Sequence, residues 1–468
     1  MNPLIVIPTY VSARSKGSTS TVTATYDHVT MLSEMGELPR ALNSLRDVAG
    51  VGTIAILVAS EPNISSQAAE KVQVIASRFP DLDILIVGSS ELLLFQQRME
   101  QLGIGRMSKE MGLSGYGAVR NLGLLVAAAL GFDSVVFLSD DEIVADEEFL
   151  RKAVYGLGKL TRMGIPILAK TGYYLDENDS PYSKDDRKWY NRRWDTGRAF
   201  NQWMQKALAG PRLSRSNVVC GGCLAIHREA FRRVAFDPWI ARGEDLDYLL
   251  NLRMYGSDIW FDNKWHLLRQ APEPSLSEGQ IFKQNVYRWL YECRKVEFSR
   301  TQIDLLQVKP ESLEPYPGPF IESGIEKRLA RAARIRGLFS RDRATYFSAA
   351  KAVGAEAGTY AERNCGRYFE LQRIWPEIMN RISNDQVIAN AFQEANAYRQ
   401  NMSSSFARQV DNQIFGNVDA AAQAAAQAAE AEAQAAAAAG QRLAAAAASA
   451  PGALDPGTTG EIRMDLAE

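Results

Sequence analysis

The chain has 468 residues, 46% hydrophobic and 23% charged, which is the composition of an ordinary globular protein with enough apolar material for a sizeable core. Its 53 basic and 55 acidic residues leave a net charge of −2, so neither nucleic acid nor an anionic membrane surface is expected as a partner. Four cysteines are too few for a disulfide framework. No secretory signal is visible, and no apolar run approaches the roughly 20 residues that span a bilayer. We therefore expect a cytoplasmic protein.

The N-terminal part of the chain alternates short apolar runs with segments whose apolar residues recur at helical spacing. The apolar runs predict strands at residues 4–8, 53–59, 83–87 and 134–138. The helical spacing predicts helices around residues 38–45, 65–76 and 117–130. Strands that alternate with helices build a doubly wound sheet, so we predict an α/β fold with a mainly parallel sheet.

The next segments are less regular. We predict further strands at residues 167–171, 218–226 and 259–261, and a helix at residues 244–255. The polar and aromatic stretch 176–196 has no clean period, which indicates an ordered loop or lid.

The chain changes character again after residue 270. From residue 277 to about 415 the pattern is mostly helical, and from 419 to 448 it is almost only Ala with Gln and Glu. We therefore expect an α/β domain at residues 1–270, a helical appendage at 271–415, and an Ala-rich low-complexity helix with a flexible tail at 416–468.

Three consecutive acids follow the predicted strand at 134–138. Asp140, Asp141 and Glu142 therefore lie at the carboxyl end of a buried strand, where open α/β sheets bind ligands. Carboxylates this close repel one another, and Mg²⁺ or Mn²⁺ held by one or two of them would relieve that repulsion while substrate phosphates fill the other positions. The alternative is an acidic helix cap. The preceding strand favours the metal.

A second acidic motif and a histidine follow about a hundred residues later. Gly243-Glu244-Asp245 opens a predicted helix, and a carboxylate there would accept a proton from a hydroxyl or position that hydroxyl. The alternative is an ordinary charged first turn. His266, one of three histidines, follows the strand after this helix and would complete a Mn²⁺ site, whereas a structural role is the alternative.

Two glycine-containing segments complete the set of candidate motifs. Glycines 115 and 117 precede Arg120, which would neutralise a phosphate, although a plain loop with a surface arginine also fits. Cys220-Gly221-Gly222-Cys223 has no second cysteine pair, so zinc is not expected, and the glycines would make room for an acceptor.

One later helix carries aromatic residues beside arginines. Trp289, Tyr291 and Phe298 share it with Arg288 and Arg294, and these side chains would border an acceptor groove. We favour the alternative of a core stripe with solvated arginines.

The order of these motifs resembles the GT-A glycosyltransferases, and the large family 2 group in particular, over about residues 4–270. The resemblance implies that the end of the first strand meets the nucleotide and that an acid after the second strand contacts the base. Under this resemblance the nucleotide-sugar-binding residues are Pro8, Thr9, Tyr10, Glu61, Arg120, Asn121 and Asp140.

The resemblance also implies roles for the acids. Asp140, Asp141, Glu142 and His266 would hold the metal. Glu244 and Asp245 match the motif that supplies the catalytic base in inverting members, and Gly221, Gly222 and Arg242 are expected on the acceptor side. A histidine after the last strand is more typical of retaining enzymes that make mannosylglycerate or glucosylglycerate, in which case Asp245 would bind acceptor.

The implied function is metal-dependent transfer of a hexose from a nucleoside-diphosphate sugar to a hydroxyl of a glycan or small molecule, as in polysaccharide or glycoconjugate biosynthesis. A nucleotidyltransferase is a rival, because Ser12, Arg14, Lys16 and Gly17 form a partly similar loop after the first strand. A non-catalytic GT-A-like scaffold is another. The C-terminal helices are a candidate surface for a homo-oligomer, and the donor, the acceptor and the linkage stay open.

Overall fold

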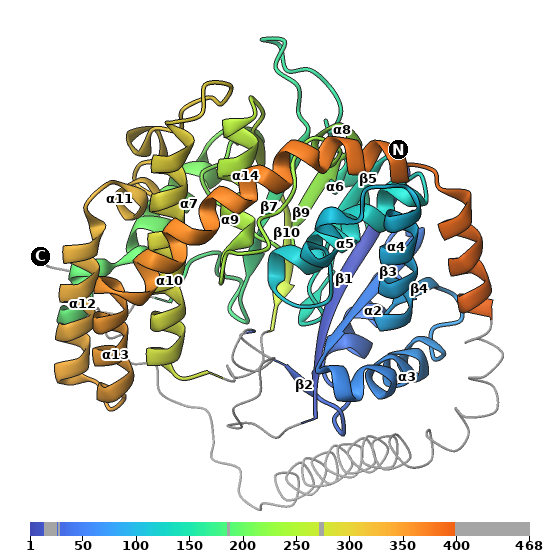
Figure 1. Ribbon diagram of the computed structural model, residues 1–468, viewed down its shortest axis with the longest axis horizontal. Coiled ribbons are helices and arrows are strands. Elements are labelled where there is room, and N and C mark those ends of the chain that lie inside the picture. Colours follow the sequence, from blue (N-terminus) through green and yellow to red (C-terminus); the bar gives the residue numbers. More distant parts are fainter. Residues whose placement is uncertain (14–25, 27–28, 185–187, 271–275, 398–468) are drawn as a thin grey trace, which may run out of the picture. The chain divides into compact units, whose positions relative to one another are not determined.

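The structure is a computed structural model that describes residues 1–13, 26, 29–184, 188–270 and 276–397 (Figure 1). The expected Ala-rich helix and tail at 416–468 lie outside the described residues. The same holds for Arg14, Lys16 and Gly17 of the loop that motivated the nucleotidyltransferase alternative.

The described strands form one sheet in the order β4-β3-β1-β5-β9-β7-β10-β6, with β2 paired to β1 and β8 paired to β10. The strands are β1 (Pro3–Ser12), β2 (Thr30–Met31), β3 (Thr53–Ser60), β4 (Asp83–Val87), β5 (Ser134–Phe137), β6 (Glu142–Ile143), β7 (Ala169–Leu175), β8 (Leu213–Arg215), β9 (Leu224–His227) and β10 (Ile259–Arg269). Strands β4, β3, β1 and β5 run parallel, β9 is antiparallel to β5 and β7, and β10 is parallel to β7. The predicted α/β fold with a mainly parallel sheet is confirmed.

Helices and short 3₁₀ turns connect the strands and follow the last one. The helices are α2 (Leu38–Leu45), α3 (Ser65–Ala76), α4 (Ser89–Gln101), α5 (Tyr116–Ala129), α6 (Phe149–Ala153), α7 (Thr196–Ala209), α8 (Arg228–Phe231), α9 (Glu244–Met254), α10 (Glu278–Ser299), α11 (Gly318–Ile321), α12 (Ile325–Phe339), α13 (Arg343–Gly354) and α14 (Glu356–Ile382). The 3₁₀ turns are η1 (Pro62–Ile64), η2 (Gly105–Glu110), η3 (Trp189–Trp194) and η4 (Pro310–Leu313).

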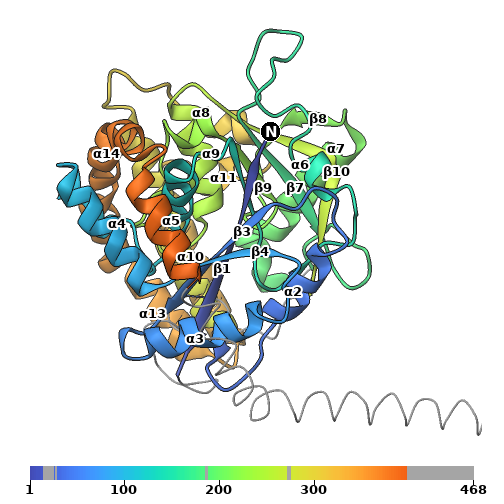
Figure 2. The same ribbon diagram turned by 90° about the vertical axis from the view of Figure 1, so that its right-hand side faces the viewer.

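Helices cover both faces of the parallel half of the sheet (Figure 2). Helix α5 packs closely on one face, because a Cβ added at Gly123 would lie 2.9 Å from the side chain of Val6 and 3.4 Å from that of Leu57. Helix α14 packs against α5, whereas α2 lies on the other side of the strands and contacts α3 and β6. Side chains alternate between the two faces of a strand, and helices cover both faces. Apolar runs such as Leu4–Ile7 are therefore buried throughout.

Of the helical region expected from residue 277 to about 415, the described part contains α10 to α14, and residues 398–415 lie outside the described residues. Its longest helix, α14, also contacts the chain that follows β9: Trp375 Nε1 donates to the Phe231 carbonyl at 2.8 Å, and Gln372 Oε1 accepts from the Ala235 amide at 2.9 Å. The hydrophobic core therefore continues across residue 270. The functional division at that residue stays a prediction. None of the described helices combines the length and apolar character that a bilayer-crossing segment requires.

Some predicted elements differ from the observed ones. Strand β10 has 11 residues, not the three predicted, and β9 begins after the two glycines of the predicted strand 218–226.

Candidate active site

The first part of the site forms where β1 separates from β5. Pairing with β5 ends at Val6, whereas pairing with β3 continues to Val11. The open edge of β1 receives the segment after β5: the Thr9 hydroxyl donates to Asp140 Oδ2 at 2.7 Å, and both residues are buried. Two residues predicted at the donor site therefore meet at the carboxyl end of parallel strands, where ligands bind in such sheets.

The three consecutive acids are buried, not solvated. Asp140, Asp141 and Glu142 are 4%, 1% and 1% exposed. Asp141 Oδ2 lies 3.5 Å from the Nε of Arg269, at the end of β10, and Glu142 accepts a hydrogen bond from the Ser139 amide at 2.8 Å. Burial, reinforced by the charge of Asp141, raises the pKa of Glu142 to about 7. Glu142 begins β6, so the alternative of an acidic helix cap is wrong.

The Gly221-Gly222 turn lies directly against this acidic segment. A Cβ added at Gly222 would lie 1.9 Å from Glu142 Oε2, and one at Gly221 would lie 2.4 Å from an Arg120 guanidinium nitrogen. The Gly222 amide donates to the Tyr174 hydroxyl at 2.6 Å. Only residues without a side chain let a carboxylate and a guanidinium rest on the same turn.

Arg120 connects this turn to the second acidic motif. Its Nε donates to Glu244 Oε1 at 2.7 Å, and another guanidinium nitrogen donates to the Gly221 carbonyl at 2.9 Å. The guanidinium also lies 4.8 Å from the ring centre of Phe137. The Arg120 and Glu244 side chains are 10% and 8% exposed, so the alternative of a solvated surface arginine is wrong. Burial raises the pKa of Glu244, and the charge of Arg120 opposes that rise.

Asp245 faces a cavity, unlike its neighbour. Gly243 adopts a left-handed φ of +77° immediately before α9, and a Cβ there would collide with Arg288, so glycine is required. The resulting turn directs Glu244 towards Arg120 and leaves Asp245 on a cavity of about 670 Å³. This site cavity is also lined by Arg269, Arg288, Tyr316 and parts of residues 174–184 and 196–200.

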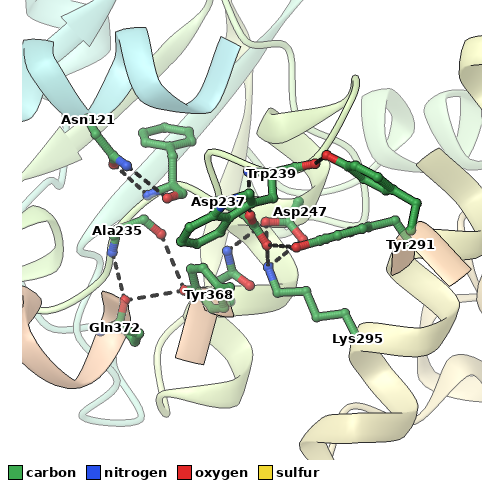
Figure 3. Close-up of polar contacts among 12 residues, drawn as sticks. Asn121, Ala235, Asp237, Trp239, Asp247, Tyr291, Lys295, Tyr368 and Gln372 are labelled. Atoms are coloured by element: carbon green, nitrogen blue, oxygen red, sulfur yellow. Dashed lines mark hydrogen bonds and ion pairs between the residues drawn. The ribbon is translucent and has the colours of Figure 1, made fainter. Parts of the chain in front are cut away.

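A buried charge cluster fixes helix α9 (Figure 3). The Nζ of Lys295, on α10, lies 2.7 Å from Asp237 Oδ2 and 2.8 Å from both carboxylate oxygens of Asp247, on α9. The Tyr291 hydroxyl donates to Asp237 at 2.8 Å, and the Lys295 ammonium lies 3.6 Å from the ring centre of Tyr368. The charged members are fully buried, so α10 and α14 determine where the first turn of α9 lies.

Asn121 has a structural partner. Its side-chain amide donates to the Phe236 carbonyl at 2.9 Å and its carbonyl accepts from the Phe236 amide at 2.8 Å, and the residue is completely buried (Figure 3). Both polar atoms are thus used within the fold, which corrects the expectation of a nucleotide-sugar contact through this side chain.

His266 lies apart from the acids. Arg269, three residues further along β10, reaches Asp141, and residues three apart on a strand point to opposite faces. His266 instead lines a separate cavity with Lys152 and Tyr173, and burial lowers its pKa. No group of three or more His, Cys, Asp or Glu residues among the described residues is arranged to hold a metal ion. The expected four-residue metal site that included His266 is corrected accordingly.

The other predicted contacts lie near the ends of β1 and α9. Glu61 accepts from the Ser12 hydroxyl at 2.7 Å and the Ala13 amide at 3.2 Å. Tyr10 follows Pro8 and Thr9 on β1, and its ring stacks on Tyr26 with centres 3.7 Å apart. Arg242 precedes Gly243 and lies 3.5 Å from Gln284 of α10. Their roles stay predictions.

Sequence reasoning missed two residues of the site cavity, Tyr174 and Arg269. Tyr174 and Arg269 lie at the ends of β7 and β10, and both strands extend beyond the predicted runs. Arg288 lines the cavity, so the favoured interpretation of solvated arginines is wrong for this residue. Cys220 and Cys223 are buried free thiols.

Comparisons with known proteins give remote similarities. No protein-family model and no curated protein matches the chain. Matching solved structures include the mannosyltransferase PcManGT from Pyrobaculum calidifontis in complex with GDP-Man and Mn²⁺, with 13% identity and a TM-score of 0.37 over 83% of this chain and 86% of that chain. A mycobacterial protein matches with 14% identity and a TM-score of 0.32 over 62% and 73%. GalNAc-T7 with UDP, GalNAc and Mn²⁺ matches with 12% identity and a TM-score of 0.36 over 72% and 57%. Values this low do not show a family.

Proposed function

We propose that the chain is a glycosyltransferase that moves a sugar from a nucleoside-diphosphate sugar to an acceptor hydroxyl. The observation that carries this proposal is the convergence of three motifs on one glycine turn. Glu142 rests on Gly222, while Arg120 bridges Gly221 and Glu244. Acids for a cation, a guanidinium for a diphosphate and a carboxylate for an acceptor are the groups that such a transfer requires.

The donor side of the proposal uses the end of β1. Thr9 is held against Asp140, and Glu61 fixes the strand end through Ser12 and Ala13. We assign nucleotide binding to this edge together with Pro8 and Tyr10. Arg120 would face the diphosphate, where its charge would stabilise the leaving group.

A divalent cation fits this site if the donor supplies most of its ligands. Asp140 and Asp141 are buried carboxylates at the sheet edge, and Mn²⁺ or Mg²⁺ needs only one or two carboxylates when phosphates complete the shell. We assign Asp140 and Asp141 to the cation. When bound, it would supply charge stabilisation for the leaving diphosphate.

On the acceptor side, Asp245 is the better candidate for the catalytic base. Glu244 is engaged by Arg120, whereas Asp245 lines the site cavity. An acceptor in that cavity would approach Gly221 and Gly222 with its hydroxyl near Asp245. A base in this position supports an inverting transfer.

A donor screen tests the proposal. UDP-, GDP- and other nucleotide sugars are incubated with Mn²⁺ and the full chain, and released nucleoside diphosphate is measured. We expect one donor to be hydrolysed slowly and Asp141→Asn to abolish that turnover with an unchanged circular dichroism spectrum. Full activity of Asp141→Asn would defeat the metal assignment. Release of pyrophosphate would support a nucleotidyltransferase, and no nucleotide binding by calorimetry would support a scaffold.

A further inference from the structure

A second cavity adjoins the site cavity. It has a volume of about 690 Å³, within the usual range for ligand sites, and is lined by η3, the first turns of α10 and the end of α12. Ser183, Lys184, Thr196 and Gly197 line both cavities. The two cavities therefore share part of their lining. We expect a long ligand that occupies the site cavity to extend into the second cavity.

The shared wall is held in place by the fold. The side chain of Asn201, on α7, accepts from the Ser183 amide at 2.8 Å and donates to the Ser183 carbonyl at 2.9 Å. A Cβ added at Gly197 would lie 3.2 Å from the Ser183 hydroxyl, so the two segments are in close contact. The Asn201 side chain thus holds the Ser183 backbone beside the start of α7.

Three aromatic rings lie at and beside the second cavity, and we call Trp189, Tyr190 and Phe339 the aromatic platform. The Phe339 ring centre lies 4.9 Å from that of Trp189 and 5.6 Å from that of Tyr190. Despite these contacts, Trp189 is 60% exposed and Phe339 is 54% exposed. Large aromatic rings exposed beside a cavity offer apolar faces to a ligand.

The remaining lining combines apolar side chains, Ile281 and Phe282 among them, with charged and polar groups. Arg198, Asn285 and Asp342 line the second cavity with the aromatic side chains of Tyr190 and Phe339. Amide, guanidinium and carboxylate groups pair with neighbouring hydroxyls, and aromatic rings pack on the C–H faces of a sugar ring. This combination suits a neutral or weakly charged glycan better than a purely apolar or purely ionic ligand.

We propose that the second cavity and the aromatic platform bind sugar units of an extended glycan acceptor, behind the unit that receives the new sugar. The inference rests on the proposed function and names its acceptor class. The site cavity holds the reacting end beside Asp245, and the shared wall guides the next units to the platform. A small-molecule acceptor would fill the site cavity and leave the platform uncovered.

Calorimetric titration of the full chain tests the inference with disaccharides and hexasaccharides of the gluco, manno, galacto and N-acetylglucosamine series. We expect at least one hexasaccharide to bind about tenfold or more tightly than its disaccharide. Trp189→Ala and Phe339→Ala should each reduce this advantage to about threefold or less. Tyr155→Ala removes an exposed ring outside both cavities and should retain it. Equal binding of both lengths, no binding of any saccharide, or an advantage that survives both variants overturns the inference.

Donor hydrolysis without acceptor separates this inference from the proposed function. Normal hydrolysis in Trp189→Ala and Phe339→Ala together with a lost length advantage supports both. Hydrolysis by the unmodified chain without any length advantage overturns the acceptor class and leaves the glycosyltransferase standing. The remaining outcome is a chain that hydrolyses no donor but binds a hexasaccharide more tightly than its disaccharide, with this preference lost in the two variants. That outcome supports glycan binding at the aromatic platform and overturns the proposed transfer.

Discussion

The Nε of Arg120 lies 2.7 Å from Glu244 Oε1, although 124 residues separate the two in the chain. The pair joins α5, on the proposed donor side, to α9, on the proposed acceptor side, and both side chains are nearly buried. Removing one partner would leave a buried charge uncompensated, whereas removing both would not.

A double-mutant cycle tests this coupling. Arg120→Met and Glu244→Gln should each lower the free energy of unfolding by about 3–5 kcal/mol. The double variant should be about 1–3 kcal/mol more stable than the sum of the single losses predicts. Urea unfolding of the four proteins measures the coupling. Strictly additive losses would show that the two side chains act independently.

The contact between Gly222 and Glu142 gives a second prediction. In Gly222→Ala the new methyl group would meet the Glu142 carboxylate at 1.9 Å, so that carboxylate or the turn must move. We expect kcat for donor hydrolysis to fall about tenfold or more, since small displacements of catalytic groups are costly. Gly354→Ala, where an added Cβ meets nothing within 4 Å, is the matched control. Equal kcat values for the two variants would argue against a site at this turn.

Asp245 and Glu177 both line the site cavity, which allows a matched comparison of two carboxylates. Asp245→Asn should lower kcat for transfer by about 10²–10⁴-fold, as expected for loss of a general base, with little change in the KM of the donor. Glu177→Gln should behave like the unmodified protein. A loss confined to acceptor KM in Asp245→Asn would assign Asp245 to acceptor binding, as in a retaining enzyme.

The pair of Arg288 and Glu292 predicts a pH dependence of stability. Burial raises the pKa of Glu292 to about 7 from an ordinary 4.5, and Arg288, 3.2 Å away, opposes the rise. Because the Glu292 carboxyl group binds its proton more tightly in the folded chain than in the unfolded chain, protonation contributes to the stability of the fold. This contribution is fully present below pH 4.5 and is lost as the pH rises through about 7. Relative to that of Glu292→Gln, the free energy of unfolding of the unmodified chain should therefore fall by up to about 3 kcal/mol between pH 4.5 and 8. Urea unfolding at both pH values measures it.

The control for this experiment is Glu370→Gln, on the exposed side of α14. The free energy of unfolding of this variant should differ from that of the unmodified chain by the same amount at both pH values. A constant difference for Glu292→Gln as well would show that Glu292 ionises normally in the folded protein.

Local pattern predicted the first half of the fold well. Leu38, Ala41, Leu42 and Leu45 are the buried residues of α2, as their spacing indicated. Strand β10 was underestimated because Asp262 interrupts its apolar run. Asp262 is buried there through an ion pair with Lys170, at 2.9 Å, and that partner lies 92 residues away in the chain. Contacts of this kind depend on tertiary structure and leave no local signal.

The site shows the same limit. The acids after β5 and the turn before α9 were identifiable, because short motifs at strand and helix ends mark them. The position of His266 depends on which face of β10 it occupies, and a register irregularity between Phe261 and His266 makes that unreadable from sequence. Arg288 lies on the cavity because α10 crosses Gly243, which the spacing within α10 does not reveal.

The cluster of Lys295, Asp237 and Asp247 limits how this protein can be rearranged. Its lysine comes from the helical region and its two carboxylates from the segment that carries Glu244. A chain cut after residue 270 would keep both acids and lose their cation. Recombination that exchanges the C-terminal helices for those of another protein would therefore have to carry a matching lysine, so the two regions are expected to be inherited together.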